Sequence, residues 1–524
     1  MSAAAAREAL ARGGKLTTTQ WIGFMAMVLG MFMAILDIQI VASSLSQVQA
    51  GLSASADEIT WVQTSYLVAE VIMIPLSGWL SRAFSTRILF AVSCMGFTLM
   101  SLLCALAWNL DSMIVFRALQ GFLGGAMIPT VFATIFIMFP REMRLRMNIV
   151  LGLVVTLAPT AGPVLGGYLT DMFSWHMMFL INVIPGILVS LAVWFFLDVD
   201  KPDHSLLKKI DFRGILYIGI FLGSLQFVLE DGVREDWFNS DAIVIAALLA
   251  VFAGIAMFWR ELTIKEPIVN LRAFGNANFA VGSLFGFVLG IGLYSAIALM
   301  PMYLAQVKGL NSFQIGMYLA VTGGFQLLFT PVAGIASQKL EPRTMLFIGM
   351  SGFAASMWLN GLLTNETGFW ELFLPQAVRG ASLMFCFIPI NDIALGTLPV
   401  DQIKNASGLF NLMRNLGGAI GLAVISTLSL KWNHFYQGQL REHVTAGNEA
   451  TQAFLTQVGG RMEQIGVANP DLGALQTLYH VALREASVLT FNDLFHGLAI
   501  IYLCSLPLVF LIKKGAHKTE GGGH

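Results

Sequence analysis

The chain has 524 residues, of which 56% are hydrophobic and only 12% are charged, and its formal net charge is −1. Soluble domains carry roughly 25% charged residues, so this composition excludes an ordinary soluble globular protein. The near-neutral balance gives no basis for nucleic-acid binding, and we expect no nucleic-acid partner.

Apolar runs that are long enough to cross a bilayer as helices recur along almost the whole chain. A hydrocarbon core of about 30 Å needs about 20 such residues. The first run contains Asp37 and is followed by many others, which favours a span over a cleaved signal peptide. We predict an all-α, polytopic protein in the lipid bilayer with fourteen spans, at 20–45, 59–80, 88–107, 113–139, 148–169, 178–198, 212–230, 241–259, 278–304, 313–336, 344–363, 371–397, 405–430 and 491–512.

Basic residues gather in the segments that are cytoplasmic if the N-terminus lies inside, such as the Arg141–Arg146 loop. An excess of Lys and Arg marks the cytoplasmic loops of membrane proteins. We therefore expect the N-terminal segment 1–19 and the tail 513–524 in the cytoplasm. All four cysteines lie inside apolar runs, which excludes a disulfide framework in the loops.

An internal repeat divides the chain. The stretch from Gly78 to Arg87 closes the second span, and the stretch from Gly334 to Arg343 closes the tenth span with the same separation. Such repeats are common in transporters. We predict an N-terminal six-helix bundle at 20–198, two extra transmembrane helices with linkers at 199–277, and a C-terminal six-helix bundle at 278–512.

The segment 431–490 is the one long extramembrane stretch, and we expect it to be an external helical hairpin. Asn469-Pro470-Asp471 is a helix-start signal. Apolar residues then recur at helical spacing from Leu472 to the last span, and a similar stripe runs from Phe454 to Ile465. Two uses remain open: the helices dock a partner, or they only pack on each other.

One carboxylate and one arginine lie at similar depths in two spans. At the helical rise per residue, Asp37 is roughly 12 Å in from the external end of the first span, and Arg117 is roughly 9 Å in on the fourth. Charges inside a membrane are costly and need partners. We predict an Asp37–Arg117 pair whose carboxylate exchanges a proton during transport; the alternative is a permanently ionised pair that only joins the two spans.

Glu70 is a second proton-coupling candidate, about 17 Å into the second span. Gln63, Tyr66 and Glu70 share one helix face, which makes a polar stripe toward the interior. The stripe could bind substrate, carry a proton, or form hydrogen bonds across the bundle. The candidate substrate contacts are Gln39, Gln63, Tyr66, Asn411 and Asn415.

Glycines, prolines and further arginines are candidates for conformational roles. Gly162 and Gly166 form a surface for close helix approach, and Pro163 removes a backbone donor and bends the fifth span. Arg379 and Arg414, in spans twelve and thirteen, are expected to serve gating or packing. The complete set is Gly78, Arg82, Arg87, Gly121, Gly162, Pro163, Gly166, Gly167, Arg379 and Arg414.

At these residues the chain resembles the fourteen-span drug/proton antiporters of the major facilitator superfamily, and specifically the EmrB-like permeases. The stretches that carry the resemblance are Leu36-Asp37-Ile38-Gln39-Ile40-Val41, Phe116-Arg117-Ala118-Leu119-Gln120-Gly121, Gly162-Pro163-Val164-Leu165-Gly166-Gly167 and Phe179-Leu180-Ile181-Asn182. Ser81 departs from the family, because an acid often stands there, so a charge relay with Arg82 and Arg87 is in doubt.

The resemblance implies a major facilitator fold and a proton-coupled antiporter that exports hydrophobic small molecules or drugs across a bacterial inner membrane. It also implies a tripartite pump with a periplasmic adaptor protein and an outer-membrane channel. The alternatives are a stand-alone exporter of a lipid-like or natural-product substrate, and a proton-coupled uptake transporter. We expect no enzyme, no cofactor and no metal site, because the sequence carries no metal-binding His cluster, nucleophile elbow or phosphate loop.

Overall fold

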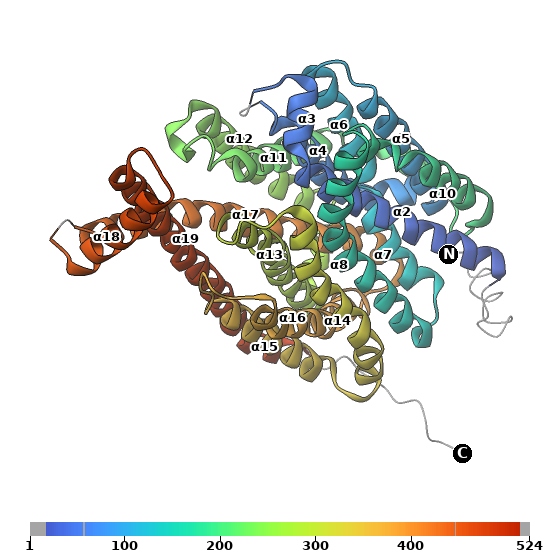
Figure 1. The fold of residues 1–524 in the computed structure, drawn as a ribbon. Coiled ribbons are helices and arrows are strands. Elements are labelled where there is room, and N and C mark those ends of the chain that lie inside the picture. Colours follow the sequence, from blue (N-terminus) through green and yellow to red (C-terminus); the bar gives the residue numbers. More distant parts are fainter. Residues whose placement is uncertain (1–16, 56–57, 446, 514–524) are drawn as a thin grey trace.

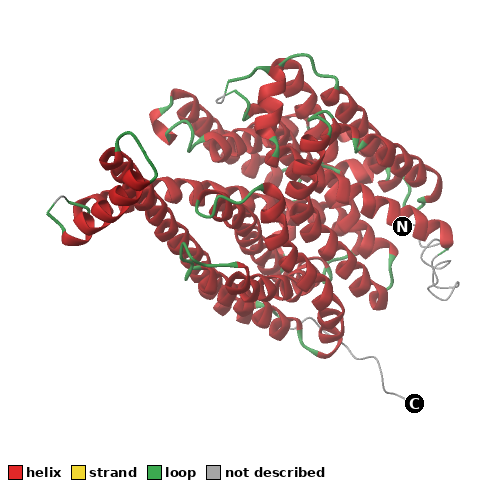
Figure 2. Ribbon diagram, in the orientation of Figure 1, coloured by secondary structure: helices red, strands yellow, loops and turns green. Residues whose placement is uncertain are grey.

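The computed structural model describes residues 17–55, 58–445 and 447–513. Within these ranges every regular element is a helix (Figure 2). A bilayer favours this solution, because a helix satisfies its own backbone hydrogen bonds where water cannot reach them. The predicted all-α class is confirmed. The expectations for 1–16 and 514–524 lie outside the described residues.

The N-terminal half is the blue-to-teal part of Figure 1. Its fourth span is divided into α6 and α7, and its sixth into α9 and α10. The helices are α2 (Thr18–Ser43), the short α3 (Leu45–Leu52), α4 (Trp61–Phe84), α5 (Thr86–Ala105), α6 (Leu110–Gly124), α7 (Met127–Met138), α8 (Arg141–Met172), α9 (Met177–Leu180) and α10 (Val183–Phe196).

Two extra helices follow, and then the C-terminal half. The first of the pair, α11, packs against α4 and α17 and so contacts both halves. The elements are η1 (His204–Lys209), α11 (Phe212–Asp231), η2 (Trp237–Asn239), α12 (Asp241–Thr263), η3 (Leu271–Gly275), α13 (Ala277–Gln306), α14 (Ser312–Lys339), α15 (Pro342–Asn360), α16 (Phe369–Leu395), α17 (Val400–His443), α18 (Glu449–Gln464), α19 (Pro470–Ser505) and η4 (Leu506–Leu511).

Each predicted span falls on a helix or on a broken helix pair. Twelve helices in the described ranges are long and apolar enough to cross a membrane, or thirteen with the bent α8 counted as one span. The remaining predicted span, 344–363, falls on α15, which packs against α16 and α19. Its polar groups are covered by protein: Ser356 is fully buried and donates to Pro375 O at 2.8 Å. Because protein covers these polar groups, α15 can be less apolar than the other spanning helices.

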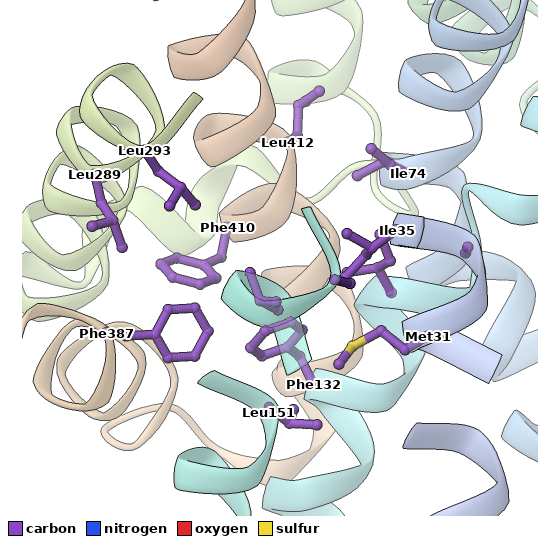
Figure 3. Packing of buried hydrophobic residues seen from close by; sticks show 14 of the residues in the cluster. Met31, Ile35, Ile74, Phe132, Leu151, Leu289, Leu293, Phe387, Phe410 and Leu412 are labelled. Carbon is purple, nitrogen blue, oxygen red and sulfur yellow. The ribbon is translucent and has the colours of Figure 1, made fainter. Parts of the chain in front are cut away.

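The two halves meet along α4 and α17 and along α8 and α14. An apolar layer lies between them, and Figure 3 shows part of it. In this layer the rings of Phe132 on α7 and Phe387 on α16 have centroids 6.1 Å apart. Met31 and Ile35 of α2 and Phe410 of α17 belong to the same cluster. Burial of these side chains holds the halves together in the conformation described.

The segment 431–490 is helical as predicted, but the flanking spans continue into it without a break. Helix α17 runs on to His443, and α19 already begins at Pro470, as its start signal predicts. Beyond the predicted end of the thirteenth span, Asn433 Nδ2 donates to Ser487 Oγ at 3.1 Å, and the Tyr436 hydroxyl donates to Asp493 at the start of the last predicted span. The hairpin with α18 therefore extends rigidly from the C-terminal half (Figure 1).

Candidate functional site

A buried ion pair joins α2 and α6. Arg117 Nη1 donates to Asp37 Oδ2 at 2.7 Å, and both side chains are fully buried. The pairing predicted from the matching depths is confirmed. Removing one member would leave an uncompensated buried charge, so each residue makes the other tolerable inside the membrane.

Two amides hold the other oxygen of the carboxylate. Asn182 Nδ2 donates to Asp37 Oδ1 at 2.7 Å, and Gln120 Nε2 donates to the same oxygen at 3.3 Å. Asn182 Nδ2 also donates to Ser101 Oγ at 3.1 Å. Both carboxylate oxygens are thus occupied, and the orientation of Asp37 is fixed by α6 and by the break between α9 and α10.

A helix break brings Asn182 to this position. Asn182 lies between α9 and α10, where the chain interrupts the sixth span. Ser101 Oγ donates to Phe179 O at 2.9 Å, so a carbonyl near the break is satisfied by a side chain. Broken helices at the midplane are a recurring way to build polar sites in transporters.

Arg117 has neutral partners as well as the carboxylate. Its Nε donates to Val62 O at 3.2 Å, and Nη1 donates to Gln120 Oε1 at 2.8 Å. The guanidinium carbon lies 4.2 Å from the ring centroid of Tyr66, a cation–π distance. These contacts would keep the guanidinium in place if Asp37 became protonated.

Gly121 allows α4 and α6 to approach closely beside the pair. A Cβ atom at this position would lie 2.2 Å from Tyr66 O, which is well inside van der Waals contact. The glycine in the Arg117 motif is therefore required by helix packing, and it places the Tyr66 ring over the arginine.

The predicted stripe on α4 faces the interior. Tyr66 is fully buried, Gln63 is half-buried, and Glu70 is 4% exposed. Glu70 is close enough to Arg117, Asp37 and Arg414 to interact with them electrostatically. Within the described ranges no hydrogen bond or ion pair involves its carboxyl group, so its role stays a prediction.

Helix α8 bends beside the ion pair. Its segments Arg146–Pro159 and Ala161–Met172 form an angle of 42°, in line with the proline effect expected in this span. A Cβ on Gly162 would lie 2.4 Å from Gln39 Cβ, and one on Gly166 would lie 2.7 Å from Ser43 Oγ. The small residues thus form a close contact with α2, and Gln39 packs there. Pro163 and Gly167 belong to the same helix.

In the C-terminal half, Arg379 and Arg414 are buried but have different partners. Arg379 donates to Ala296 O at 3.2 Å and to Thr322 Oγ1 at 3.0 Å. Arg414 Nη2 donates to Asn411 Oδ1 at 2.7 Å. In the described ranges no carboxylate lies within ion-pair distance of either arginine.

The two predicted substrate contacts on α17 are engaged with protein groups. Asn411 Nδ2 donates to Ser407 O at 2.9 Å, while its oxygen accepts from Arg414, so this side chain orients the arginine. Asn415 Oδ1 accepts from the Tyr294 hydroxyl at 3.5 Å.

At the other end of α4 an ion pair crosses between the halves. Lys404 of α17 pairs with Asp200, and its Nζ also donates to Ser81 O at 2.9 Å. Asp200 accepts from Thr86 N at 3.0 Å, so it also caps the start of α5. Asp200, from the segment after α10, thus supplies the acid that Ser81 lacks.

The remaining residues of this loop motif have separate roles. A Cβ on Gly78 would lie 2.7 Å from Lys404 O, so this glycine lets α4 meet α17. The main-chain oxygen of Arg82 accepts a hydrogen bond from Asp203 N at 3.0 Å. Arg87 is exposed. The contacts of Asp200 and Lys404 therefore stand in place of the charge relay that Ser81 put in doubt.

The sequence did not predict the contacts of five candidate functional residues. Gln120 and Asn182 stand inside motifs that were singled out, but nothing in the sequence indicated that both contact Asp37. Ser101 and Asp200 had no signal, because each acts through a distant segment. Lys404 was counted only as a basic residue of a cytoplasmic loop.

Comparison with known families gives one match that spans most of the chain. The family model of the Major Facilitator Superfamily matches residues 27–422. The relatives include the colistin resistance protein EmrB of Acinetobacter baumannii, which is 41% identical over 95% of this chain and 97% of its own. The multidrug export protein EmrB of Escherichia coli K12 is 31% identical over 95% and 97%. The fatty acid resistance protein FarB of Neisseria gonorrhoeae is 28% identical over 95% and 96%.

Solved structures share the fold at low sequence identity. The human organic anion transporter MFSD10 aligns with a TM-score of 0.56 and 14% identity, covering 92% of this chain and 99% of that one. A bacterial homolog of the human lysosomal transporter Spinster, inward-facing and unoccupied, aligns with a TM-score of 0.53 and 14% identity over 95% and 98%.

Proposed function

Because the chain belongs to the Major Facilitator Superfamily and is a drug efflux permease of the EmrB type, we propose that it works as a proton-coupled antiporter. Its cargo would be hydrophobic small molecules, and protons moving inward would drive their export. The observation that carries this proposal is the buried pair of Asp37 and Arg117, with both carboxylate oxygens held by named donors.

The chemistry of the pair suits a proton carrier. A carboxylate inside the membrane can exist as an ion beside a guanidinium or as a neutral acid. Protonation removes one member of the ion pair, and the neutral contacts of Arg117 with Val62 and Gln120 then carry the guanidinium alone. A proton therefore changes the balance of forces between α2 and α6, which is what a coupled transporter requires.

Transport can be tested in everted membrane vesicles, where the cytoplasmic side faces outward. When a panel of hydrophobic dyes is added to vesicles with an acidic interior, at least one dye should accumulate inside while the pH gradient decreases. Matched vesicles without the protein give the baseline. Accumulation that is unaffected when the gradient is collapsed would contradict proton coupling.

We place the protein in a Gram-negative inner membrane with both termini in the cytoplasm. The distribution of basic residues supports this orientation. The hairpin around α18 would then stand in the periplasm, where a rigid extension of this kind has no transport task of its own.

The hairpin is proposed to dock a periplasmic adaptor protein, which in turn contacts an outer-membrane channel. Leu472, Leu475 and Tyr479 share one face of α19 and are 55%, 51% and 50% exposed. Apolar stripes at helical spacing are typical contacts for a partner helix. At the helical rise, Leu475 lies roughly 24 Å along α19 from the predicted membrane boundary, so lipid tails cannot cover this stripe.

Replacing 445–468 by a short Gly-Ser linker is expected to abolish drug resistance in cells while leaving vesicle transport intact. The design keeps the contacts of Asn433 with Ser487 and of Tyr436 with Asp493, which hold the two long helices together. Leu472→Ser/Tyr479→Ser alters the exposed stripe on α19, which the linker variant retains, and it should also lower resistance. Full resistance after both changes would favour a stand-alone exporter.

A further inference from the structure

Two buried groups of opposite charge come from different halves and are not bonded to each other. Glu70 of α4 is 4% exposed, and in the described ranges its carboxyl group has no hydrogen bond or ion pair. Arg414 of α17 is 3% exposed, and its Nε and Nη1 have no hydrogen-bond partner among the described residues. Charges that are buried without partners are strongly unfavourable, so this arrangement calls for an explanation.

The helix register places the two groups near each other. Gly78 lies against Asn405, and Gly408 lies against Ile74, so α4 and α17 run antiparallel. One more turn along both helices brings Glu70 level with residues 411–412, which is less than one turn from Arg414. The electrostatic interaction between Glu70 and Arg414 agrees with this register.

The internal repeat shows what a neutral side chain does at this position. The match of Gly78 with Gly334 makes Gln326 of α14 the counterpart of Glu70. Gln326 is 1% exposed, and its Nε2 donates to Gly152 O of α8 at 3.4 Å, which is a hydrogen bond between the halves.

Helix packing supports the same alignment of the repeats. A Cβ on Gly121 would lie 2.2 Å from Tyr66 O, and one on Gly380 would lie 2.2 Å from Thr322 O. Tyr66 and Thr322 each precede the matched position by one turn. At matched positions of the repeat, Gln326 therefore makes an uncharged hydrogen bond between the halves, whereas Glu70 is an ionisable group.

We propose that Glu70 and Arg414 form an ion pair across the interface when the halves adopt their other arrangement, and that protonation of Glu70 breaks this pair. The inference deepens the proposed function, on which it rests, by naming a second proton-sensitive contact. The proton binds to the Glu70 carboxylate and removes its attraction for the guanidinium. Proton binding thereby favours the arrangement described here, in which the two are apart.

The other charges near Glu70 and Arg414 do not outweigh the attraction between these two residues. The titratable and charged groups that face it are Asp37 of α2, Arg117 of α6, Tyr66 of α4 and Tyr294 of α13. Asp37 and Arg117 neutralise each other in their own pair. Glu70 and Arg414 are therefore the remaining net charges at this level of the interface.

The proposal is tested by measuring the distance between the halves as a function of pH. Spin labels at Trp108→Cys and Glu366→Cys report the external ends of the two halves, and both native side chains are exposed. Cys504→Ser removes the exposed cysteine, while Cys94, Cys104 and Cys386 are buried. In the otherwise unchanged full-length protein, the ratio of the two distance populations should shift about tenfold between about pH 8 and about pH 5, a typical coupling strength.

Glu70→Gln and Arg414→Gln should each abolish this shift, and the double variant should behave like either single variant. Arg414→Lys keeps the charge and should restore a pH response, which separates the ion pair from a purely structural role. A wild-type response in Arg414→Gln, or single effects that add in the double variant, would overturn the proposal. Failure of wild-type vesicles to accumulate any panel dye would instead count against the proposed function.

Discussion

Asp37→Asn is expected to abolish proton-driven accumulation of substrate. Asparagine keeps the shape and can still accept from Asn182 through its oxygen. However, it has no titratable proton, and its amide would face the Arg117 Nη1 donor that now bonds to the carboxylate. Breaking a buried pair costs about 3–5 kcal/mol, so the variant should also be less stable in detergent.

The measurement is dye uptake into vesicles after an imposed pH jump, made only on preparations that remain monodisperse. Asp111→Asn is the matched control, because Asp111 is an exposed carboxylate in the first turn of the same helix as Arg117. It should transport like the wild type. If a well-folded Asp37→Asn protein still concentrated dye in response to the jump, Glu70 would become the leading carrier.

Gly121→Ala is expected to lower the free energy of unfolding by about 1–3 kcal/mol, as overpacking does. The new methyl group would lie 2.2 Å from Tyr66 O, and a backbone oxygen cannot rotate away. Helices α4 and α6 must therefore separate, which also moves the Tyr66 ring from its position over Arg117. We expect transport to fall together with stability.

Thermal unfolding in detergent measures this effect. Gly497→Ala in α19 is the matched control. Apart from the chain neighbours and the backbone of its own helix, no atom lies within 4 Å of the added Cβ. It should change the unfolding temperature little or raise it, since alanine is the better helix former. Equal unfolding temperatures for the two variants would contradict the close approach at Gly121.

The fold was largely predictable because a helix that spans a bilayer needs about 20 mostly apolar residues. Apolar length placed each predicted span on a helix or on a broken helix pair of the described residues. Helix ends were less predictable: α17 continues to His443 because its external part is stabilised by α19, a distant contact. The breaks at Gly125 and Asn182 also depend on neighbouring helices.

The candidate site was predictable in part. Depth along a helix was enough to pair Asp37 with Arg117, because a charge in the membrane must find a counter-charge at its own level. The direction in which each side chain points could not be predicted from its depth along the helix. Asn411 is predicted to contact substrate, and this stays a prediction, but its hydrogen bond with Arg414 of the same helix was not predicted. Asp200 lies far from Lys404 in the chain, so its contact depends on the tertiary fold.

Proton release on substrate binding shows whether Asp37 carries the proton. An antiporter that binds proton and substrate in turn should release protons when substrate is added to the purified protein. A pH indicator in weakly buffered detergent solution reports this release, with the panel dye that the wild type exports as the probe. We expect release from the wild type and from Asp111→Asn, and a smaller release from Asp37→Asn, in which Glu70 alone can still give up a proton. Release of the same number of protons from a well-folded Asp37→Asn protein would contradict this role of Asp37.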